Sequence, residues 1–398
     1  MSLPQEFPVD QVEKIHAVLG DQQVYVIKQD GLVGWTSVYP AIRLAAENVT
    51  IEPGDRILLF GCHQGALPAY MSLKYPHNPL AVIYHDYSAL EASRKTLKIN
   101  KIPIDSIRYI TDAEMPEVED DKFDVVIMLL PKGRSLARKW LIQIYYGLAS
   151  TGQLYIAGAN REGIQSVLKD ASDVFGGGRV LAYGKGNRIC QFSAAKRKAG
   201  LPGWASNPGI SPGSWVEFTV EIQGNRINIH SLPGIFSYDH LDEGTRMLLN
   251  AIEIPPGAKV LDAGCGYGVI GITAAMLGAG KVDLIDNNLL AVAASHETIH
   301  VNQVNSCTAL AGDLLEPLTP LQYDLVLSNP PFHAGHAVEY QMARSIIAQS
   351  YLTLVPGGQV VIVANRFIRY DRLIKDIFGN CTILMESNKF YVLRGLKL

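Results

Sequence analysis

The sequence of 398 residues is poor in cysteine, and the cysteines it does have are scattered. The five are Cys62, Cys190, Cys265, Cys307 and Cys381, and none stands at Cys-x-x-Cys spacing. Paired spacings indicate zinc sites, and a regular even set indicates the disulfide framework of small secreted proteins. We therefore expect no metal, no disulfide framework and a cytoplasmic location.

Long apolar runs and an excess of charge of one sign are missing as well. No stretch of about 18 apolar residues occurs, and the first residues lack the basic and apolar regions of a signal peptide. The net charge is -3, with 48% hydrophobic and 18% charged residues, as in ordinary globular proteins. We expect no membrane partner. Because Lys and Arg supply much of the affinity for nucleic acids, any nucleic-acid contact must use a local patch.

The sequence does contain an internal repeat. Residues 51–65 align with residues 254–268, and each segment has a Pro-Gly turn, an apolar run and a glycine-bearing loop. Further on, the run that ends at Asp86 aligns with the run that ends at Asp286. Short apolar runs that alternate with longer mixed segments are typical of βαβ units. The sequence therefore predicts an α/β protein with two tandem Rossmann-like domains, as its length also suggests.

The density of turn-forming residues predicts the boundary between the two domains. Breakers are frequent between about Ala194 and Gly213, including Asn207-Pro-Gly and Ser211-Pro-Gly. We expect a first domain over residues 1–195, a linker over 196–213 and a second domain over 214–398. An alternating run around Gly224-Asn225 predicts a β-hairpin at the start of the second domain.

A glycine-rich loop in the second domain predicts a cofactor site. A strand that contains Asp262 leads into this loop, which holds Gly264, Gly266 and Gly268 and precedes a helix-compatible run. Two later apolar runs end near Asp286 and Asp313, and acids that follow successive parallel strands meet at one crevice. Nicotinamide and flavin enzymes also use such loops, so the choice of cofactor depends on the next motif.

The most informative motif is Asn329-Pro330-Pro331-Phe332, which follows a strand-like run. An exocyclic amine on a planar ring is a poor nucleophile because its lone pair is delocalised. The oxygen of the Asn329 side chain and the Pro330 carbonyl can accept its two hydrogens and so position the nitrogen. Pro331 helps to fix the backbone, and Phe332 can stack on the planar target. The motif thus predicts methylation of an amino nitrogen, with His333 and His336 as rim residues rather than metal ligands.

These features resemble class I methyltransferases, whose domains are mostly parallel seven-stranded sheets flanked by helices. The resemblance implies that Asp286 holds the ribose of S-adenosylmethionine and Asp313 its adenine amino group. The loop from Gly264 to Gly268 would hold the amino-acid portion, with Asn329 beside it, and Asp262 would support the loop.

More narrowly, the chain resembles bacterial ribosomal RNA guanine-N2 methyltransferases of the RsmC and RlmG type, which pair a degenerate copy with a catalytic one. The segment 232–245, Asn329 to His333 and the run ending at Arg366 carry this resemblance, and the tail from Phe378 resembles the 23S-directed members. It implies that Gly244 and Thr245 line the cofactor pocket and that ribosomal RNA, or a ribosomal subunit, is the partner. Phe332, His333 and Arg366 are the substrate contacts expected in the catalytic copy, and we expect a monomer.

The N-terminal copy departs from the pattern at the residues that matter most. His63 stands where Gly266 is expected, and Leu129-Leu130 replace Asn329-Pro330, so we expect this copy to be catalytically silent. It retains basic residues that either touch RNA phosphate or form a solvated helix face: Lys132, Arg134, Arg138 and Lys139.

Two other functions remain compatible with the residues. The same amine-holding chemistry serves methylation of adenine N6 in DNA or of a glutamine amide in a protein. A factor that binds RNA and has cofactor affinity without catalysis is the third possibility.

Overall fold

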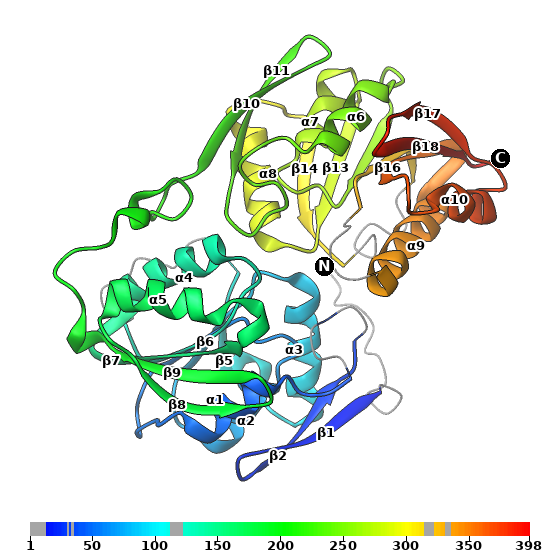
Figure 1. The fold of residues 1–398 in the computed structure, drawn as a ribbon. Helices are drawn as coiled ribbons and strands as arrows, with labels where there is room; N and C mark the ends of the chain where they lie inside the picture. Colours follow the sequence, from blue (N-terminus) through cyan, green and yellow to red (C-terminus); the bar gives the residue numbers. More distant parts are fainter. Residues whose placement is uncertain (1–12, 30–31, 33–35, 112–121, 314–321, 331–335) are drawn as a thin grey trace. The chain divides into compact units, whose positions relative to one another are not determined.

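The computed structural model describes residues 13–29, 32, 36–111, 122–313, 322–330 and 336–398. The chain divides into two compact units, residues 1–212 and 213–398, and both are α/β structures (Figure 1). The segment predicted as a linker belongs mostly to the first unit, where the ring of Trp204 lies 4.8 Å from the guanidinium of Arg138. None of the described helices is long and apolar enough to cross a membrane.

The C-terminal unit contains a seven-stranded sheet with the order β14-β13-β12-β15-β16-β18-β17. Strands from β14 to β16 pair in parallel, whereas β16, β18 and β17 pair antiparallel. The strands are β12 (Lys259–Ala263), β13 (Lys281–Asp286), β14 (Cys307–Ala311), β15 (Tyr323–Ser328), β16 (Leu354–Asn365), β17 (Thr382–Glu386) and β18 (Phe390–Leu396). The helices are α6 (Glu243–Ala251), α7 (Val269–Met276), α8 (Leu289–Val301), α9 (His336–Thr353) and α10 (Tyr370–Phe378). A hairpin of β10 (Val216–Ile222) and β11 (Asn225–Ser231) precedes them, as the alternating run predicts.

The N-terminal unit repeats this order in a second seven-stranded sheet, β5-β4-β3-β6-β7-β9-β8. The strands are β3 (Ile57–Phe60), β4 (Leu80–Ile83), β5 (Ile107–Ile110), β6 (Phe123–Leu129), β7 (Leu148–Ala159), β8 (Arg179–Gly184) and β9 (Asn187–Ser193). The helices are α1 (Pro40–Asn48), α2 (Ala66–Lys74), α3 (Tyr87–Ile99), α4 (Arg134–Gly147) and α5 (Ile164–Phe175), after a hairpin of β1 (Lys14–Leu19) and β2 (Gln22–Ile27). The prediction of two tandem, mostly parallel seven-stranded domains is confirmed.

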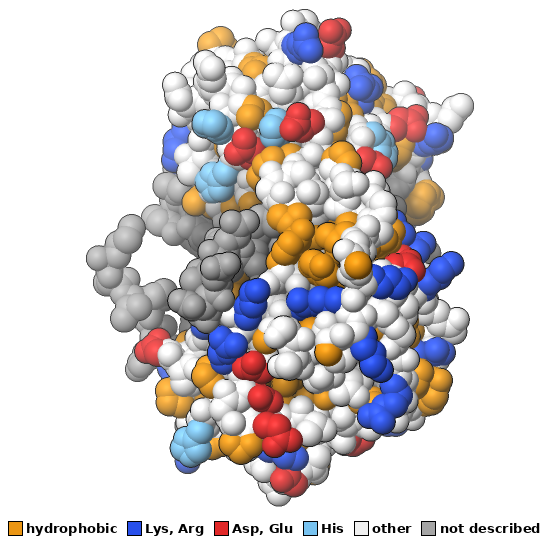
Figure 2. Space-filling model, turned by 90° about the vertical axis from the view of Figure 1, so that its left-hand side faces the viewer, with side chains coloured by type: hydrophobic (Ala, Val, Ile, Leu, Met, Phe, Trp, Pro, Cys, Tyr) orange, Lys and Arg blue, Asp and Glu red, His pale blue; other side chains and the backbone are white. Residues whose placement is uncertain are grey.

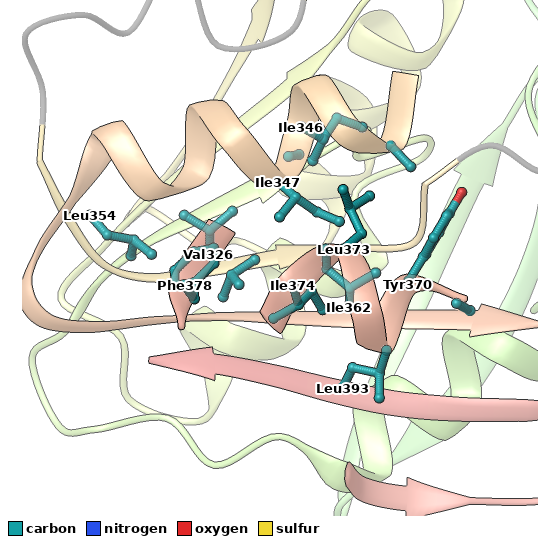
Figure 3. Close-up of a cluster of buried hydrophobic side chains, with 14 of the residues drawn as sticks. Val326, Ile346, Ile347, Leu354, Ile362, Tyr370, Leu373, Ile374, Phe378 and Leu393 are labelled. Carbon is teal, nitrogen blue, oxygen red and sulfur yellow. The ribbon is translucent and has the colours of Figure 1, made fainter. Parts of the chain in front are cut away.

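Both faces of the sheet in the C-terminal unit are covered by helices, which explains why its central strands are apolar throughout. Successive residues of a strand point to opposite faces, and β13 shows this clearly. Leu284 packs against α7, where a Cβ at Gly271 would lie 2.7 Å from it. Ile285 belongs instead to the core on the other face, under α9 and α10. In Figure 3 that core places Ile347 of α9 and Ile374 of α10 over the sheet.

The duplication extends to the hairpin that precedes each sheet. In the C-terminal unit, the Asn302 side chain pairs with both backbone groups of Asn228, at 3.0 Å to the nitrogen and 2.6 Å to the oxygen. In the N-terminal unit, Asn100 does the same to Tyr25, at 2.9 and 2.6 Å. Each amide therefore extends its hairpin ladder onto a helix, α8 or α3. This shared device fixes the position of the hairpin in both units.

One detail of the sequence alignment is wrong. The register of β12 with β13 pairs Ala263 with Ile285, and the register of β3 with β4 pairs Phe60 with Ile83. Ile285 and Ile83 are therefore equivalent, so the counterpart of Asp286 is Tyr84 and not Asp86. Asp86 instead caps α3 by accepting a hydrogen bond from the Ala89 nitrogen at 2.8 Å. The sequence alignment pairs the two aspartates because both are acidic, although Asp86 lies two residues after the structural counterpart of Asp286.

Candidate active site

A cavity of about 340 Å³ opens at the carboxyl ends of β12, β13 and β15 in the C-terminal unit. This is the edge of a parallel α/β sheet where ligands bind. Predicted site residues line it: Thr245, Gly264, Gly266, Asp286, Asp313, Asn329 and Pro330. Further lining residues that the sequence did not single out include Ile235, Phe236, Tyr267, Asn288 and Ile346.

Three predicted residues lie behind this lining. Asp262 is fully buried beneath the loop, and Gly268 forms the N-cap of α7. Gly244 lies in the first turn of α6, where a Cβ would come within 3.3 Å of the Phe390 ring. Pro331, Phe332 and His333 lie outside the described residues.

The glycine-rich loop needs its glycines for conformation. Gly264, Gly266 and Gly268 have φ angles of 77°, 55° and 86°, a region that L side chains rarely adopt. At Gly268 space is also short, because a Cβ would lie 3.0 Å from the Ser295 hydroxyl oxygen. The Ser295 hydroxyl itself donates to the Gly266 carbonyl at 2.9 Å, which holds the loop against α8.

Asp286 is held by the loop on one side and by the start of α8 on the other. Its Oδ2 accepts from the Gly266 nitrogen at 2.8 Å, and its Oδ1 accepts from the Asn288 nitrogen at 2.8 Å. The backbone of Asn287 also donates to this carboxylate, and because a carboxylate has about four acceptor positions, it still has room for a hydroxyl donor from a ligand. Desolvation by burial raises the pKa of Asp286, against the lowering effect of these backbone donors.

Asp262 supports the loop from below. Its Oδ2 accepts from the Gly271 nitrogen in α7 at 2.8 Å, and its Oδ1 has no partner among the described residues. Burial is the main reason that the pKa of Asp262 rises to about 7, and the nearby charge of Asp286 adds to it. The side chain is therefore a structural acceptor whose charge is costly, rather than a ligand contact.

The side-chain amide of Asn329 has a fixed orientation. Its Nδ2 donates to the Thr245 hydroxyl at 2.7 Å and lies 3.2 Å from Oδ2 of Asp242. The same Asp242 oxygen caps α6 by accepting from the Thr245 nitrogen at 2.9 Å. With Nδ2 so engaged, Oδ1 of Asn329 has no hydrogen-bond partner among the described residues. An unsatisfied buried acceptor is costly, so its presence at a cavity wall points to an N–H donor from a ligand.

Asp242 is a positioning residue that sequence reasoning also missed. It lies within the segment 232–245 that carries the family resemblance, and an acid three residues before Thr245 is a recognisable N-cap pattern. Its second contact, to Asn329, joins positions 87 residues apart and has no local signal in the sequence.

The predicted substrate contacts outside the cavity have partners of their own. Arg366 donates to the Ser387 carbonyl at 3.1 Å and lies 3.7 Å from Glu386, so it braces the β17–β18 turn. Arg134, in the N-terminal unit, makes a two-pronged ion pair with the buried Asp170, at 2.7 and 2.8 Å. Lys132 is exposed beside it. No metal-binding group of three or more His, Cys, Asp or Glu exists among the described residues.

The N-terminal copy preserves the shape of this loop while changing its chemistry. Gly61, His63 and Gly65 have φ angles of 76°, 47° and 87°, which match the glycine-rich loop of the C-terminal unit position by position. Four side chains differ: Leu59, His63, Tyr84 and Leu129 stand where Asp262, Gly266, Asp286 and Asn329 stand. Burial, with repulsion from His85, lowers the pKa of His63 to about 4, and burial lowers the pKa of His85 to about 4 as well. Both imidazole rings are therefore uncharged at pH 7 and act as packing residues.

This strand order, with a glycine loop after the first strand and Asn-Pro-Pro after the fourth, defines a class I methyltransferase. The Methyltransferase small domain family matches residues 226–394, and the Methyltransferase small domain N-terminal family matches residues 52–194.

Similar proteins cover most of the chain. The ribosomal RNA small subunit methyltransferase C of Aliivibrio fischeri (strain MJ11) is 31% identical over 297 residues, which are 74% of this chain and 83% of that protein. Its Pseudomonas entomophila counterpart is 34% identical over 71% of this chain and 81% of that protein. A solved structure of the T. thermophilus 16S rRNA N2 methyltransferase (RsmC), in complex with AdoMet and guanosine, has a TM-score of 0.78 and 25% identity, covering 97% and 98% of the two chains. This chain belongs to the family of ribosomal RNA small subunit methyltransferase C.

Proposed function

We propose that this protein transfers a methyl group from S-adenosylmethionine to the exocyclic N2 amine of a guanine in ribosomal RNA. The observation that carries this proposal is the anchored amide of Asn329, a residue that lines the cavity and whose buried side-chain oxygen has no partner among the described residues. The relatives named for ribosomal RNA methylation cover most of the chain, and the solved relative contains AdoMet and guanosine.

The residues around the cavity fit the three parts of S-adenosylmethionine, which when bound supplies an electrophilic methyl group on a sulfonium. Asp286, whose carboxylate is held in place by backbone donors, would accept from the ribose hydroxyls. Asp313 would receive the adenine amino group, and the loop from Gly264 to Gly268, with Thr245, would hold the amino-acid end. Gly244 and Asp262 would act without touching the cofactor. Gly244 lets α6 lie close to Phe390 of β18, and Asp262 holds the start of α7 beside the glycine-rich loop.

The same cavity wall holds the acceptor side. The Asn329 oxygen and the Pro330 carbonyl would accept the two N–H groups of the guanine amine and turn its lone pair toward the methyl group. Because Asp242 and Thr245 hold the amide beforehand, little reorganisation is needed as positive charge develops on the nitrogen. After transfer the nitrogen is strongly acidic and loses its proton to water, so no strong base is required. Phe332 would stack on the purine, with Pro331, His333 and Arg366 shaping the entrance.

The N-terminal copy, within the predicted boundaries 1–195, would not catalyse. Its Leu129 offers no acceptor, and Tyr84 offers no carboxylate for a ribose. We expect the protein to act as a monomer in the cytoplasm.

The test is methyl transfer from labelled S-adenosylmethionine to small-subunit and large-subunit ribosomal RNA, taken from cells that lack the gene. Both subunits are included because the relatives are named for the small one, whereas the tail resembles the 23S-directed members. Mass spectrometry of the digested product should find N2-methylguanosine. Label in adenine or in protein would instead favour the other amine targets, and no transfer to any RNA would refute the proposal.

The variant Asn329→Ala should lose roughly 10²-fold or more in kcat, as expected for removal of one preorganised polar contact to the transition state. If this variant complemented a deletion strain without restoring the modification, the protein would act as a non-catalytic RNA factor.

A further inference from the structure

An exposed aromatic ring stands at the rim of the C-terminal sheet. Phe367 follows β16, and its side chain is 71% exposed, more than that of any other Phe, Tyr or Trp among the described residues. It is not among the residues that line the cavity. Single exposed apolar side chains are common and carry no meaning by themselves. Phe367 differs from them in its position, its backbone and its counterpart in the other unit.

Phe367 lies at the same edge of the sheet as the Asn329 amide. The strands β15 and β16 are parallel neighbours, and the last residue of β15, Ser328, pairs with Ile362. Asn329 follows directly on one strand, while β16 continues for three more residues, to Asn365. Because adjacent strands lie about 4.8 Å apart, the turn that holds Phe367 borders the chain beyond β15, at the carboxyl edge from which a substrate approaches the cavity.

The backbone on both sides of Phe367 is fixed by hydrogen bonds. On one side, the Arg366 nitrogen donates to the Lys389 carbonyl at 2.9 Å. On the other side, the Ile368 nitrogen donates to the Asn365 carbonyl at 3.0 Å. A ring on a fixed backbone has only two side-chain torsions left to order, so it can bind a flat partner at a low cost in conformational entropy.

The N-terminal unit forms the same turn with another side chain. The strands β7 and β16 are both 12 residues long and occupy the same place in their sheets, so Arg161 is the counterpart of Phe367. The hydrogen bond that fixes the turn is present as well, because the Asn160 nitrogen donates to the Gly186 carbonyl at 2.8 Å. The fold therefore accepts Arg or Phe at this position. An exposed ring that the fold does not require points to a ligand.

The surroundings of the ring favour stacking over charge pairing. Residues 213–398 contain 12 Lys and Arg against 17 Asp and Glu, a net charge of -5. Asp, Glu and His side chains are spread over the face of this unit that Figure 2 displays, in the upper part of the view. The cation next to the ring, Arg366, lies 3.7 Å from Glu386. Phosphate neutralisation is therefore a weak source of affinity here, whereas a base can stack on a ring without any charge.

The reaction itself creates a need for such a ring. To place its amine against Asn329 and Pro330, the target base has to leave the stack of its own strand, and this unstacking costs free energy. The neighbouring base in the strand then has one bare face. An aromatic side chain at the rim of the cavity can cover that face and so offset part of the cost.

We propose that Phe367 stacks on a nucleotide adjacent to the target guanine and so holds the RNA strand while the guanine occupies the cavity. The inference rests on the proposed function, in that the substrate is taken to be RNA. Phe367 is then a substrate contact that acts on binding, whereas Asn329 and Pro330 act on the reacting nitrogen.

The first test measures methyl transfer by full-length variants to the ribosomal RNA that the wild type modifies. Phe367→Leu keeps an apolar side chain without a flat ring, and Phe367→Trp keeps a ring. The control is Leu352→Ala, which shortens a side chain of similar exposure, 72%, in the last turn of α9 beside the amino end of β16. Affinity for S-adenosylmethionine should be unchanged in all three variants, which also checks folding.

Phe367→Leu should raise the KM for RNA by about 5- to 100-fold, the range for the loss of one stack between a base and an aromatic ring, with kcat little changed. The salt dependence of KM should stay that of the wild type, because no phosphate contact is lost. Phe367→Trp and Leu352→Ala should behave like the wild type. Equal KM values for Phe367→Leu and Leu352→Ala, or a KM for Phe367→Trp as high as that of Phe367→Leu, would overturn the inference.

The second test identifies the stacked base. The wild type and Phe367→Leu are compared in their binding to a synthetic RNA strand that contains the modified guanine, either intact or with one neighbouring base removed. For one of the abasic strands the wild type should lose affinity by a factor similar to the rise in KM, and Phe367→Leu should lose nothing further. Equal losses in the two proteins would contradict stacking by Phe367 while leaving the proposed function in place. Absence of methyl transfer from the wild type to any RNA would refute the proposed function, and this inference with it.

Discussion

At the scale of single residues, Asp242 combines two tasks that other residues of the chain perform separately. One carboxylate oxygen caps α6 and also faces the amide that would hold the substrate amine. Asp86 caps α3 in the N-terminal unit with a bond of similar length, 2.8 Å, and belongs to no predicted site. Asp86 therefore serves as a control for Asp242: both residues cap a helix, but only Asp242 also contacts the Asn329 amide.

Both Asp242→Ala and Asp86→Ala should lose about 1 kcal/mol of stability, as is typical when an N-cap is removed. Only Asp242→Ala should also lose kcat, by roughly 10- to 100-fold, because the Asn329 amide can then rotate away from its productive orientation. Thermal unfolding and steady-state methylation with saturating cofactor measure the two effects. Equal kcat values for the two variants would show that Asp242 is only a cap.

The buried Asp262 makes the stability of the catalytic unit depend on pH. Its pKa is raised to about 7, so the folded state keeps a proton that the unfolded chain releases near pH 4. The stabilising effect of the protonated form is complete below pH 4 and is lost as pH rises to about 7. The wild type should therefore lose on the order of a few kcal/mol across this window.

The variant Asp262→Asn keeps an acceptor for the Gly271 nitrogen and cannot ionise. Its stability should fall less than that of the wild type between pH 4.5 and pH 8, measured by urea unfolding without cofactor. The cost of burying the new amide donors is the same at every pH and leaves this comparison unaffected. Parallel stability curves for the two proteins would show that Asp262 does not titrate in this window.

At the scale of elements, the two hairpins can be compared to separate effects on the stability of the fold from effects on the cavity. Asn302→Ala and Asn100→Ala each remove the amide that joins a hairpin to a helix, and each should lower the free energy of unfolding by roughly 1–3 kcal/mol. Only β11 leads into the cavity wall at Gly234, which accepts a hydrogen bond from Asn288 at 2.8 Å.

Cofactor affinity should therefore weaken in Asn302→Ala and remain unchanged in Asn100→Ala. Calorimetric titration with S-adenosylmethionine below the unfolding temperature makes the comparison. A matching decrease of affinity in both variants would mean that general destabilisation, and not the cavity wall, is responsible.

The sequence predicts the strands and loops well because the repeated apolar runs and the glycine loop are local signals. It places the polar residues of the cavity lining for the same reason, since they lie at strand ends: Asp286 ends β13, Asn329 follows β15 directly and Asp313 lies two residues after β14. It fails where the information lies in the register between strands: the pairing of Asp86 with Asp286 ignores the two-residue difference that Tyr84 reveals. It also could not show that Arg134 and Arg138 are bound to Asp170, because that ion pair joins segments more than 30 residues apart.

At the scale of the whole molecule, the duplication has produced two sheets of one design with different tasks. The N-terminal copy retains the loop conformation even where His63, at φ 47°, replaces a glycine. The conformation of this loop is therefore part of the fold of both copies and does not require the side chains that would hold a cofactor. The N-terminal copy has lost those side chains, and its second half, with 13 Lys and Arg against 4 Asp and Glu over residues 122–198, carries charge that the catalytic copy lacks.

The number of cofactor molecules bound by each chain follows from this division. A ribose needs the paired acceptors of a carboxylate, and the N-terminal copy has the Tyr84 hydroxyl at that position. The wild type should bind one S-adenosylmethionine per chain in calorimetric titration. Asp286→Ala should abolish that binding, whereas Tyr84→Phe, its counterpart in the other sheet, should leave stoichiometry and affinity unchanged. Residual binding in Asp286→Ala that disappears when Tyr84→Phe is added would place a second cofactor in the N-terminal sheet, and the two copies would then differ in catalysis but not in cofactor binding.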